Sequence, residues 1–118
     1  MKKKIHIKLA SEDIIDIFVD AIKTDNKITY KDNDISVVIT ILDDEIHMKR
    51  KSDDYTISLI FKLGDTISNY QVFGGSKTFD LETHTKKLII DDDKILIDYN
   101  LGGNDFSFEL EVIEWKQY

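Results

Sequence analysis

The sequence predicts an all-β protein: a single antiparallel, meandering β-barrel of about eight to ten strands that spans residues 1–118. Three observations support this fold class. Short segments alternate apolar and polar residues, they recur at intervals of roughly ten residues, and tight turns rich in Asp, Asn and Gly separate them. No proline interrupts the segments, and no loop is long enough for Greek-key crossovers. Closing the sheet on itself would remove the exposed edges that favour aggregation.

The first third of the chain has the weaker alternation. Lys3–Leu9 is expected to form a strand, and Ser11–Lys23 fits either a strand or a helix. As a strand it places four apolar residues on one face: Ile15, Ile17, Val19 and Ala21. As a helix it forms an apolar stripe behind a cap at Ser11: Ile14, Ile15, Phe18 and Ile22. Its β-branched residues favour the strand. A turn at Asp25-Asn26 then leads into a short strand, Lys27–Lys31.

From Ile35 onward the alternation is regular, and every second residue is expected to face the barrel interior. The inward rows are, in chain order, Ile35, Val37, Ile39 and Ile41; Ile46, Met48 and Arg50; Tyr55, Ile57, Leu59, Phe61 and Leu63; Phe79, Leu81, Thr83 and Thr85; Ile95, Ile97, Tyr99 and Leu101; and Phe106, Phe108, Leu110 and Val112. Ile67–Phe73 and Lys87–Asp91 are further strand segments, Gly74-Gly75 is a turn, and Trp115 is expected to close the barrel mouth.

Composition narrows the class of protein. A chain of 118 residues with 42% hydrophobic and 33% charged residues is expected to form one globular domain. The absence of cysteine excludes disulfides and thiolate metal sites and fits a cytoplasmic location. A net charge of −7 argues against a nucleic-acid partner. No apolar run is long enough to cross a bilayer, so no membrane partner is expected. Nothing in the sequence calls for a cofactor.

Several spaced motifs after Ile35 resemble the YwiB-like family of uncharacterised bacterial proteins. The motifs are Thr40-Ile41, Ile46-His47-Met48-Lys49-Arg50, Leu59-Ile60-Phe61, Gly64, Tyr70, Gly74-Gly75, Leu81-Glu82-Thr83 and Ile95–Leu101. Ser52 and Val72 stand where the family pattern has glycine and threonine, and the N-terminal third matches poorly. The resemblance implies a calycin-like (lipocalin-like) β-barrel and a bacterial cytoplasmic setting, but no activity, because the family has no established function. Its likeness to lipid-binding calycins is an analogy of fold.

The alternation points to one candidate site inside the barrel. Arg50, the single arginine of the chain, shares a face with Ile46 and Met48. A buried guanidinium needs a protein acid or an anionic ligand, or it must extend to water. Tyr70, Thr83 and Tyr99 also face inward, so with Arg50 they could hold a small anionic or amphipathic molecule. Alternatively, Arg50 pairs with a protein acid and the tyrosines merely fill the barrel.

The remaining patterns favour a non-enzymatic protein. No nucleophile with a base, no pair of catalytic carboxylates and no phosphate-binding glycine loop is present. His6, His47 and His84 face outward on different strands, so a zinc site is not expected. If a protein acid neutralises Arg50, function must be sought on the surface. Glu82, Glu109 and Glu111 would then give the barrel an acidic outer face that suits a basic protein partner.

Overall fold

The computed structural model describes residues 2–11, 14–72 and 76–113 and contains ten β-strands in this part of the chain. The strands are β1 (Lys2–Ala10), β2 (Ile14–Lys23), β3 (Lys27–Asp32), β4 (Ile35–Ile41), β5 (Glu45–Lys51), β6 (Tyr55–Lys62), β7 (Gly64–Val72), β8 (Lys77–Ile90), β9 (Lys94–Leu101) and β10 (Asn104–Ile113). Ser11–Lys23, which fits two structures in the sequence, therefore contains strand β2. The tendency of β-branched residues to form strands is confirmed there.

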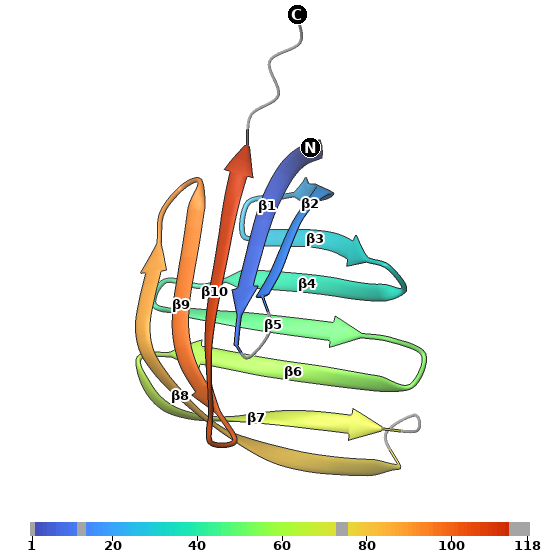
Figure 1. The fold of residues 1–118 in the computed structure, drawn as a ribbon, viewed down its shortest axis with the longest axis vertical. Coiled ribbons are helices and arrows are strands. Elements are labelled where there is room, and N and C mark those ends of the chain that lie inside the picture. The colour runs from blue at the N-terminus through green and yellow to red at the C-terminus, as the bar shows by residue number, and fades with distance from the viewer. Residues whose placement is uncertain (1, 12–13, 73–75, 114–118) are drawn as a thin grey trace, which may run out of the picture.

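The ten strands close into one antiparallel barrel. Each strand pairs with the next strand along the chain, and β1 pairs with β10 to complete the ring. Strands β3 to β7 run across the direction of β1, β2, β9 and β10 (Figure 1). β8 connects the two groups: its first part pairs with β7, its last part pairs with β9, and the register shifts between Thr85 and Lys87. The predicted meandering barrel is confirmed.

The barrel interior is occupied by the side chains of its own strands. Alternation along each strand turns every second residue inward, and these residues form one buried apolar cluster that includes Ile39, Phe61 and Ile97. All strands except β7 and β8 contribute buried apolar side chains to it. Those two strands instead contribute buried hydroxyls, on Ser68, Thr83 and Thr85. The core is therefore apolar with one polar sector.

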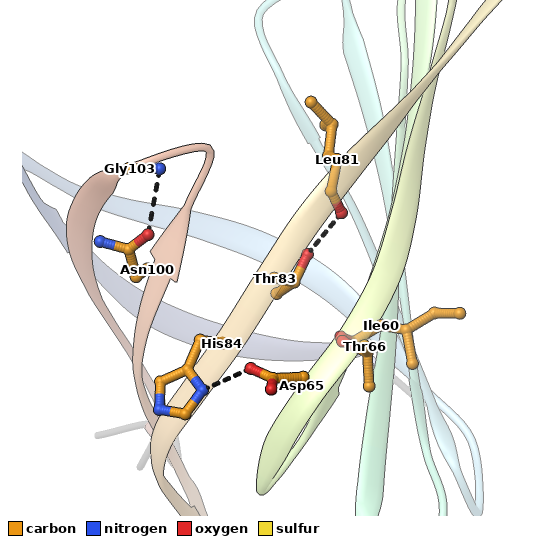
Figure 2. A network of polar contacts seen from close by, with 8 residues as sticks. All are labelled: Ile60, Asp65, Thr66, Leu81, Thr83, His84, Asn100 and Gly103. Carbon is orange, nitrogen blue, oxygen red and sulfur yellow. Dashed lines mark hydrogen bonds and ion pairs between the residues drawn. The ribbon is translucent and has the colours of Figure 1, made fainter.

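That polar sector joins β6 to β7 where their backbones separate. Regular pairing between the two strands covers only Tyr55–Ser58 and Asn69–Val72. Beyond it, the Ile60 N–H donates to Ser68 Oγ at 3.0 Å, and Thr66 Oγ1 donates to the Ile60 carbonyl. Figure 2 shows Thr66 beside Ile60. Side-chain hydroxyls thus satisfy both backbone groups of Ile60, which a separated strand would otherwise leave unpaired.

The contact between β2 and β3 is short. Only Ala21, Ile22 and Lys23 pair with β3, opposite Tyr30, Thr29 and Ile28. The earlier part of β2 pairs with β1 in an uninterrupted ladder, from Ile14 opposite Ala10 to Ile22 opposite Lys2. Within the described residues, the stretch 14–20 therefore has a strand neighbour on one side only.

Two predicted inward residues are exposed. Leu63 is 63% exposed because β6 ends at Lys62 and the chain reverses at Gly64, whose φ of 99° suits glycine. Phe79 is also exposed, since it lies near the start of β8, where its ring contacts Tyr70 rather than the core. The expectations for Gly74-Gly75 and Trp115 concern residues outside the described part of the chain.

Candidate functional site

Arg50 lies on the inner face of β5, two residues beyond buried Met48 and next to the end of the strand. Its cross-strand neighbours are Val37 on β4 and Ile57 on β6, and its side chain is 22% exposed. Asp32, the last residue of β3, places Oδ2 at 4.0 Å from Arg50 Nη2. The arginine at the rim of the barrel therefore has a carboxylate partner from the protein itself, one of the two alternatives that the sequence left open.

Two buried tyrosines lie within electrostatic reach of Arg50. Burial raises the pKa of Tyr30 to about 12, and the positive charge of Arg50 partly opposes this shift. Burial likewise raises the pKa of Tyr99 to about 12, again against the influence of Arg50. The Tyr99 ring packs on Phe61 and Phe106, with centroid distances of 4.5 and 5.3 Å. Both phenols are therefore neutral at physiological pH and form part of the packed interior.

Tyr70 and Thr83, the other predicted site residues, make their contacts elsewhere. The Tyr70 ring lies between Tyr55 and Phe79, with centroid distances of 5.8 and 6.3 Å. Thr83 is buried and lies 2.8 Å from Ser68 Oγ, and its own hydroxyl donates to the Leu81 carbonyl at 3.2 Å (Figure 2). Each residue thus belongs to a local cluster of its own, one aromatic and one of hydroxyls.

Sequence reasoning missed Tyr30 and Asp32, the β3 residues that accompany Arg50. Their signal was present, because Ile28, Tyr30 and Asp32 alternate with polar residues and share one face of the strand. Asp32 reads as a turn residue, since Asn33 and Asp34 follow it directly. Asp32 is the last residue of the short strand β3, so its inward carboxylate could not be told apart from the turn that follows.

The outer face that contains Glu109 and Glu111 carries mixed charge. Glu109 Oε1 lies 3.0 Å from Lys94 Nζ, and across the sheet Glu109 stands opposite Lys8. Glu111 stands opposite both His6 and Lys94. The hydrogen bond from Lys94 to Glu109, with the charges of Glu109 and Glu111, raises the pKa of Lys94. Local cations therefore offset these two glutamates, and the surface is less acidic than the sequence suggests.

The three histidines lie on separate strands and each has a neighbouring carboxylate. His6 on β1 contacts Asp16, His47 on β5 lies 3.3 Å from Glu45, and His84 on β8 lies 2.7 Å from Asp65. Among the residues that the structure describes, no three potential ligands converge on a metal position. Each histidine therefore has a local carboxylate neighbour on its own part of the sheet, and the three rings do not form a common site.

An open hollow of about 360 Å³ lies on the outer surface, where β7 and β8 meet the turn between β9 and β10. Its lining residues are Asp65, Thr66, Ile67, Glu82, Thr83, His84, Asn100, Gly102 and Gly103. Figure 2 shows the His84–Asp65 contact and the Asn100 side chain, whose oxygen accepts from the Gly103 N–H at 3.0 Å. Gly102 and Gly103 both have positive φ, as a type I′ hairpin requires. These contacts order the turn, so the hollow is explained by the architecture of the hairpin.

The most apolar exposed surface belongs to β2. Its outward residues Ile14 and Phe18 are 77% and 58% exposed, and Ile22 on the same face is also exposed. Phe18 stacks on the His6 ring, with centroids 4.2 Å apart, so its position on the surface is fixed. The same part of β2 has one strand neighbour within the described residues. Exposed apolar side chains beside a free strand edge are typical of interaction surfaces.

These features define a small all-β protein: a closed ten-stranded antiparallel barrel with a packed interior and an apolar strand on its outside. The structure is similar to the crystal structure of the YwiB protein from Bacillus subtilis, with a TM-score of 0.69 and 20% sequence identity. The match covers 98% of this chain and 94% of that one. At this identity the likeness shows a shared fold, and at that level it confirms the resemblance to YwiB-like proteins.

The other comparisons found no relative. No family model matches the chain, and no curated protein matches it. Among the described residues, no helix is long and apolar enough to cross a membrane.

Proposed function

We propose that this chain is a non-enzymatic protein-interaction module of the bacterial cytoplasm that works through its outer surface. The observation that carries the proposal is the apolar face of β2, where Ile14 and Phe18 are exposed beside a strand edge that has no partner among the described residues. A globular protein gains free energy by burying such side chains, so their exposure in a strand is expected where a partner covers them.

The state of the barrel interior supports a surface function. Asp32 partners Arg50, and Tyr30 and Tyr99 pack in the core with neutral phenols. Three hollows, at Thr66, Asp92 and Asp53, are lined by strand surfaces and turns of the described residues, and Arg50 and Tyr99 are not among their lining residues. These contacts support a structural role for the inward side chains and a recognition role for the outer surface.

Charge also limits the kind of partner. The net charge of −7 opposes the close approach of another acidic surface over most of the barrel. Near β2, however, Asp16 is matched by His6 and Asp20 by Lys4, so the apolar residues supply most of the contact. We therefore expect a partner that contacts β2 mainly through apolar side chains.

Affinity capture from a bacterial lysate, with quantitative mass spectrometry, tests the proposal. The double variant Ile14→Lys/Phe18→Lys removes the apolar face, and both positions are exposed enough to accept lysine without loss of the fold. Ile67→Lys on β7 is the matched control, because Ile67 is 56% exposed. A protein retained by the wild type and the control but lost from the double variant is expected. Equal retention by all three would contradict a role for β2.

A second candidate is an anion site at the rim of the barrel. Arg50 is partly exposed, and within the described residues its one ionic partner is Asp32 at 4.0 Å, with no hydrogen bond to the guanidinium. Several of its N–H donors therefore remain available to a carboxylate or phosphate group of a small anionic or amphipathic molecule. This arrangement favours a weak site that competes with Asp32.

Isothermal titration with inorganic phosphate and with a medium-chain fatty acid tests the rim site. Arg50→Met is expected to abolish binding, while Lys51→Met, at the next position on the opposite face, leaves it unchanged. Absence of binding to the wild type, or equal binding by Arg50→Met, would exclude the site for these two classes of anion.

A further inference from the structure

We propose that the free edge of β2 pairs with β2 of a second copy of this chain, antiparallel and about a twofold axis. The inference rests on the proposed function and deepens it, because it names the partner of the β2 surface. Three properties of the described structure lead to it: the direction of the unpaired backbone groups, the scarcity of protecting residues, and the charge pattern of the strand.

The backbone of β2 presents a regular row of hydrogen-bonding groups away from β1. The Thr24 N–H donates to the Lys27 carbonyl in the β2–β3 turn, so the backbone groups of Thr24 point toward β3. Because the β1–β2 ladder has no bulge, every second residue before Thr24 has the same orientation. Outside the three residues of β2 that pair with β3, the outward-directed backbone groups thus face the free edge. They are the N–H and C=O groups of Ile14, Asp16, Phe18 and Asp20.

Among the described residues, the edge has few of the features that usually prevent strand addition, and its two charged residues, Asp16 and Asp20, each contact a β1 side chain. The stretch 14–20, IIDIFVD, contains no proline, lysine or glycine, and its ladder has no bulge. Proteins commonly protect edge strands with lysine, proline, bulges or inward-facing charges, and here the face opposite Asp16 and Asp20 carries only the apolar residues Ile15, Ile17 and Val19. An edge of this length, protected only by Asp16 and Asp20, can accept another strand in a register that keeps these acids apart.

The charge pattern selects one register for pairing with a second β2. When Ile17 stands opposite Ile17 of the second copy, Asp16 faces Phe18 and Asp20 faces Ile14, so no acid meets an acid. Sliding by two residues in one direction places Asp16 opposite Asp16. Sliding in the other direction places Asp16 opposite Asp20. Like charges directly opposite each other are destabilising, so the strand is complementary to itself in the first register.

The side chains support the same register. On the outer face, each Phe18 would lie diagonal to Phe18 and Ile14 of the second copy, within reach of an aromatic ring. On the other face, Ile15 would stand opposite Val19 and Ile17 opposite Ile17. Within each chain His6 contacts Asp16 and Lys4 lies 3.2 Å from Asp20, which reduces repulsion between the acids near the axis. Pairing would thus place Ile14 and Phe18 of the two copies side by side on the outer face and reduce the exposure of their side chains.

Disulfide trapping with Ile17→Cys tests the register directly, since the natural chain has no cysteine. A non-hydrogen-bonded antiparallel pair has Cα atoms about 4.5 Å apart, which is within the range of a disulfide. We expect rapid oxidation of Ile17→Cys to a covalent dimer. Ile15→Cys is the matched control, because it is more exposed but faces Val19. It is expected to cross-link only when mixed with Val19→Cys.

Sedimentation of the uncross-linked protein completes the test. The wild type is expected to show concentration-dependent dimerisation, and Phe18→Pro, which removes an N–H at the free edge but none bonded to β1, is expected to be monomeric and folded. Ile14→Lys/Phe18→Lys provides a second monomeric variant if proline disturbs the strand. A wild type that stays monomeric, or Ile17→Cys that cross-links no faster than Ile15→Cys, would overturn the inference.

The two proposals fail separately. A monomeric chain that still captures another protein through Ile14 and Phe18 would overturn self-association and leave the interaction function standing. A monomeric chain that captures nothing would overturn both.

Discussion

Substitution of Ser68 by alanine is the sharpest test of how the barrel closes between β6 and β7. Thr83 donates to the Leu81 carbonyl, so the hydrogen of Ser68 Oγ points to Thr83 at 2.8 Å and its lone pair accepts from the Ile60 N–H. One fully buried hydroxyl therefore connects three strands. Ser68→Ala leaves the Ile60 N–H without an acceptor, and it leaves Thr83 Oγ1 without its donor.

The expected cost follows from burial. A buried donor left unsatisfied costs about 1–3 kcal/mol, so the free energy of unfolding of Ser68→Ala should fall by that amount. Thr66→Ala is the comparison, because Thr66 bonds the carbonyl of the same Ile60 but is only half-buried. Water can replace its hydroxyl, and a loss below about 1 kcal/mol is expected.

Urea unfolding followed by circular dichroism measures both free energies, and amide hydrogen exchange reports on Ile60. Ser68→Ala should accelerate exchange at Ile60 far more than Thr66→Ala. A cycle with Thr83→Val should give a coupling energy of about 0.5 kcal/mol or more with Ser68→Ala. If Ser68→Ala is no more destabilising than Thr66→Ala, or exchange at Ile60 is unchanged, the contact between β6 and β7 does not depend on the buried Ser68 hydroxyl.

Two further predictions concern the rim of the barrel. Tyr30 and Tyr99 have pKa values raised by burial from 10.0 to about 12, so the stability that they confer is complete below pH 10 and is lost as the pH rises toward 12. Tyrosinate absorbance should show two phenols titrating late in the folded chain, and Tyr30→Phe should remove one; titration of every phenol near pH 10 would contradict the assigned burial. Asp32→Asn should lower the free energy of unfolding by less than about 1 kcal/mol, and less in high salt, because the pair with Arg50 is partly exposed and long. A larger, salt-independent loss would mean that Asp32 has another structural role.

Much of the fold was predictable because the alternation of apolar and polar residues along a strand indicates which of its faces is buried. The row Ile95, Ile97 and Tyr99 is buried as the alternation predicts, and the turn at Gly102-Gly103 is a hairpin whose φ angles suit glycine. Leu63 was predicted wrongly because alternation contains no information on where a strand leaves the barrel. The position of Gly64, one residue later, decided the outcome.

The candidate site was predictable only in part. Arg50 was identified because it shares a strand face with Ile46 and Met48. Pairing of Arg50 with a protein acid was also foreseen as the alternative to ligand binding. The identity of the acid was not predictable, because Asp32 is eighteen positions earlier in the chain and looks like part of a turn. Thr83 was expected near a ligand, whereas its contacts are with Ser68 and Leu81. Partners contributed by distant strands depend on register, which local patterns do not specify.

By itself the sequence determined most of the strands, turns and inward faces and the presence of one cation on an inward face, since these depend on neighbouring residues and on a period of two. Only the tertiary structure decided where adjacent strands separate. Barrel curvature parts β6 from β7, where hydroxyls bridge the gap, and β2 from β3, where the edge beside Phe18 stays free. The outward side chains of Ile14 and Phe18 are exposed on the face of β2, and within the described residues the edge beside them has no second strand neighbour.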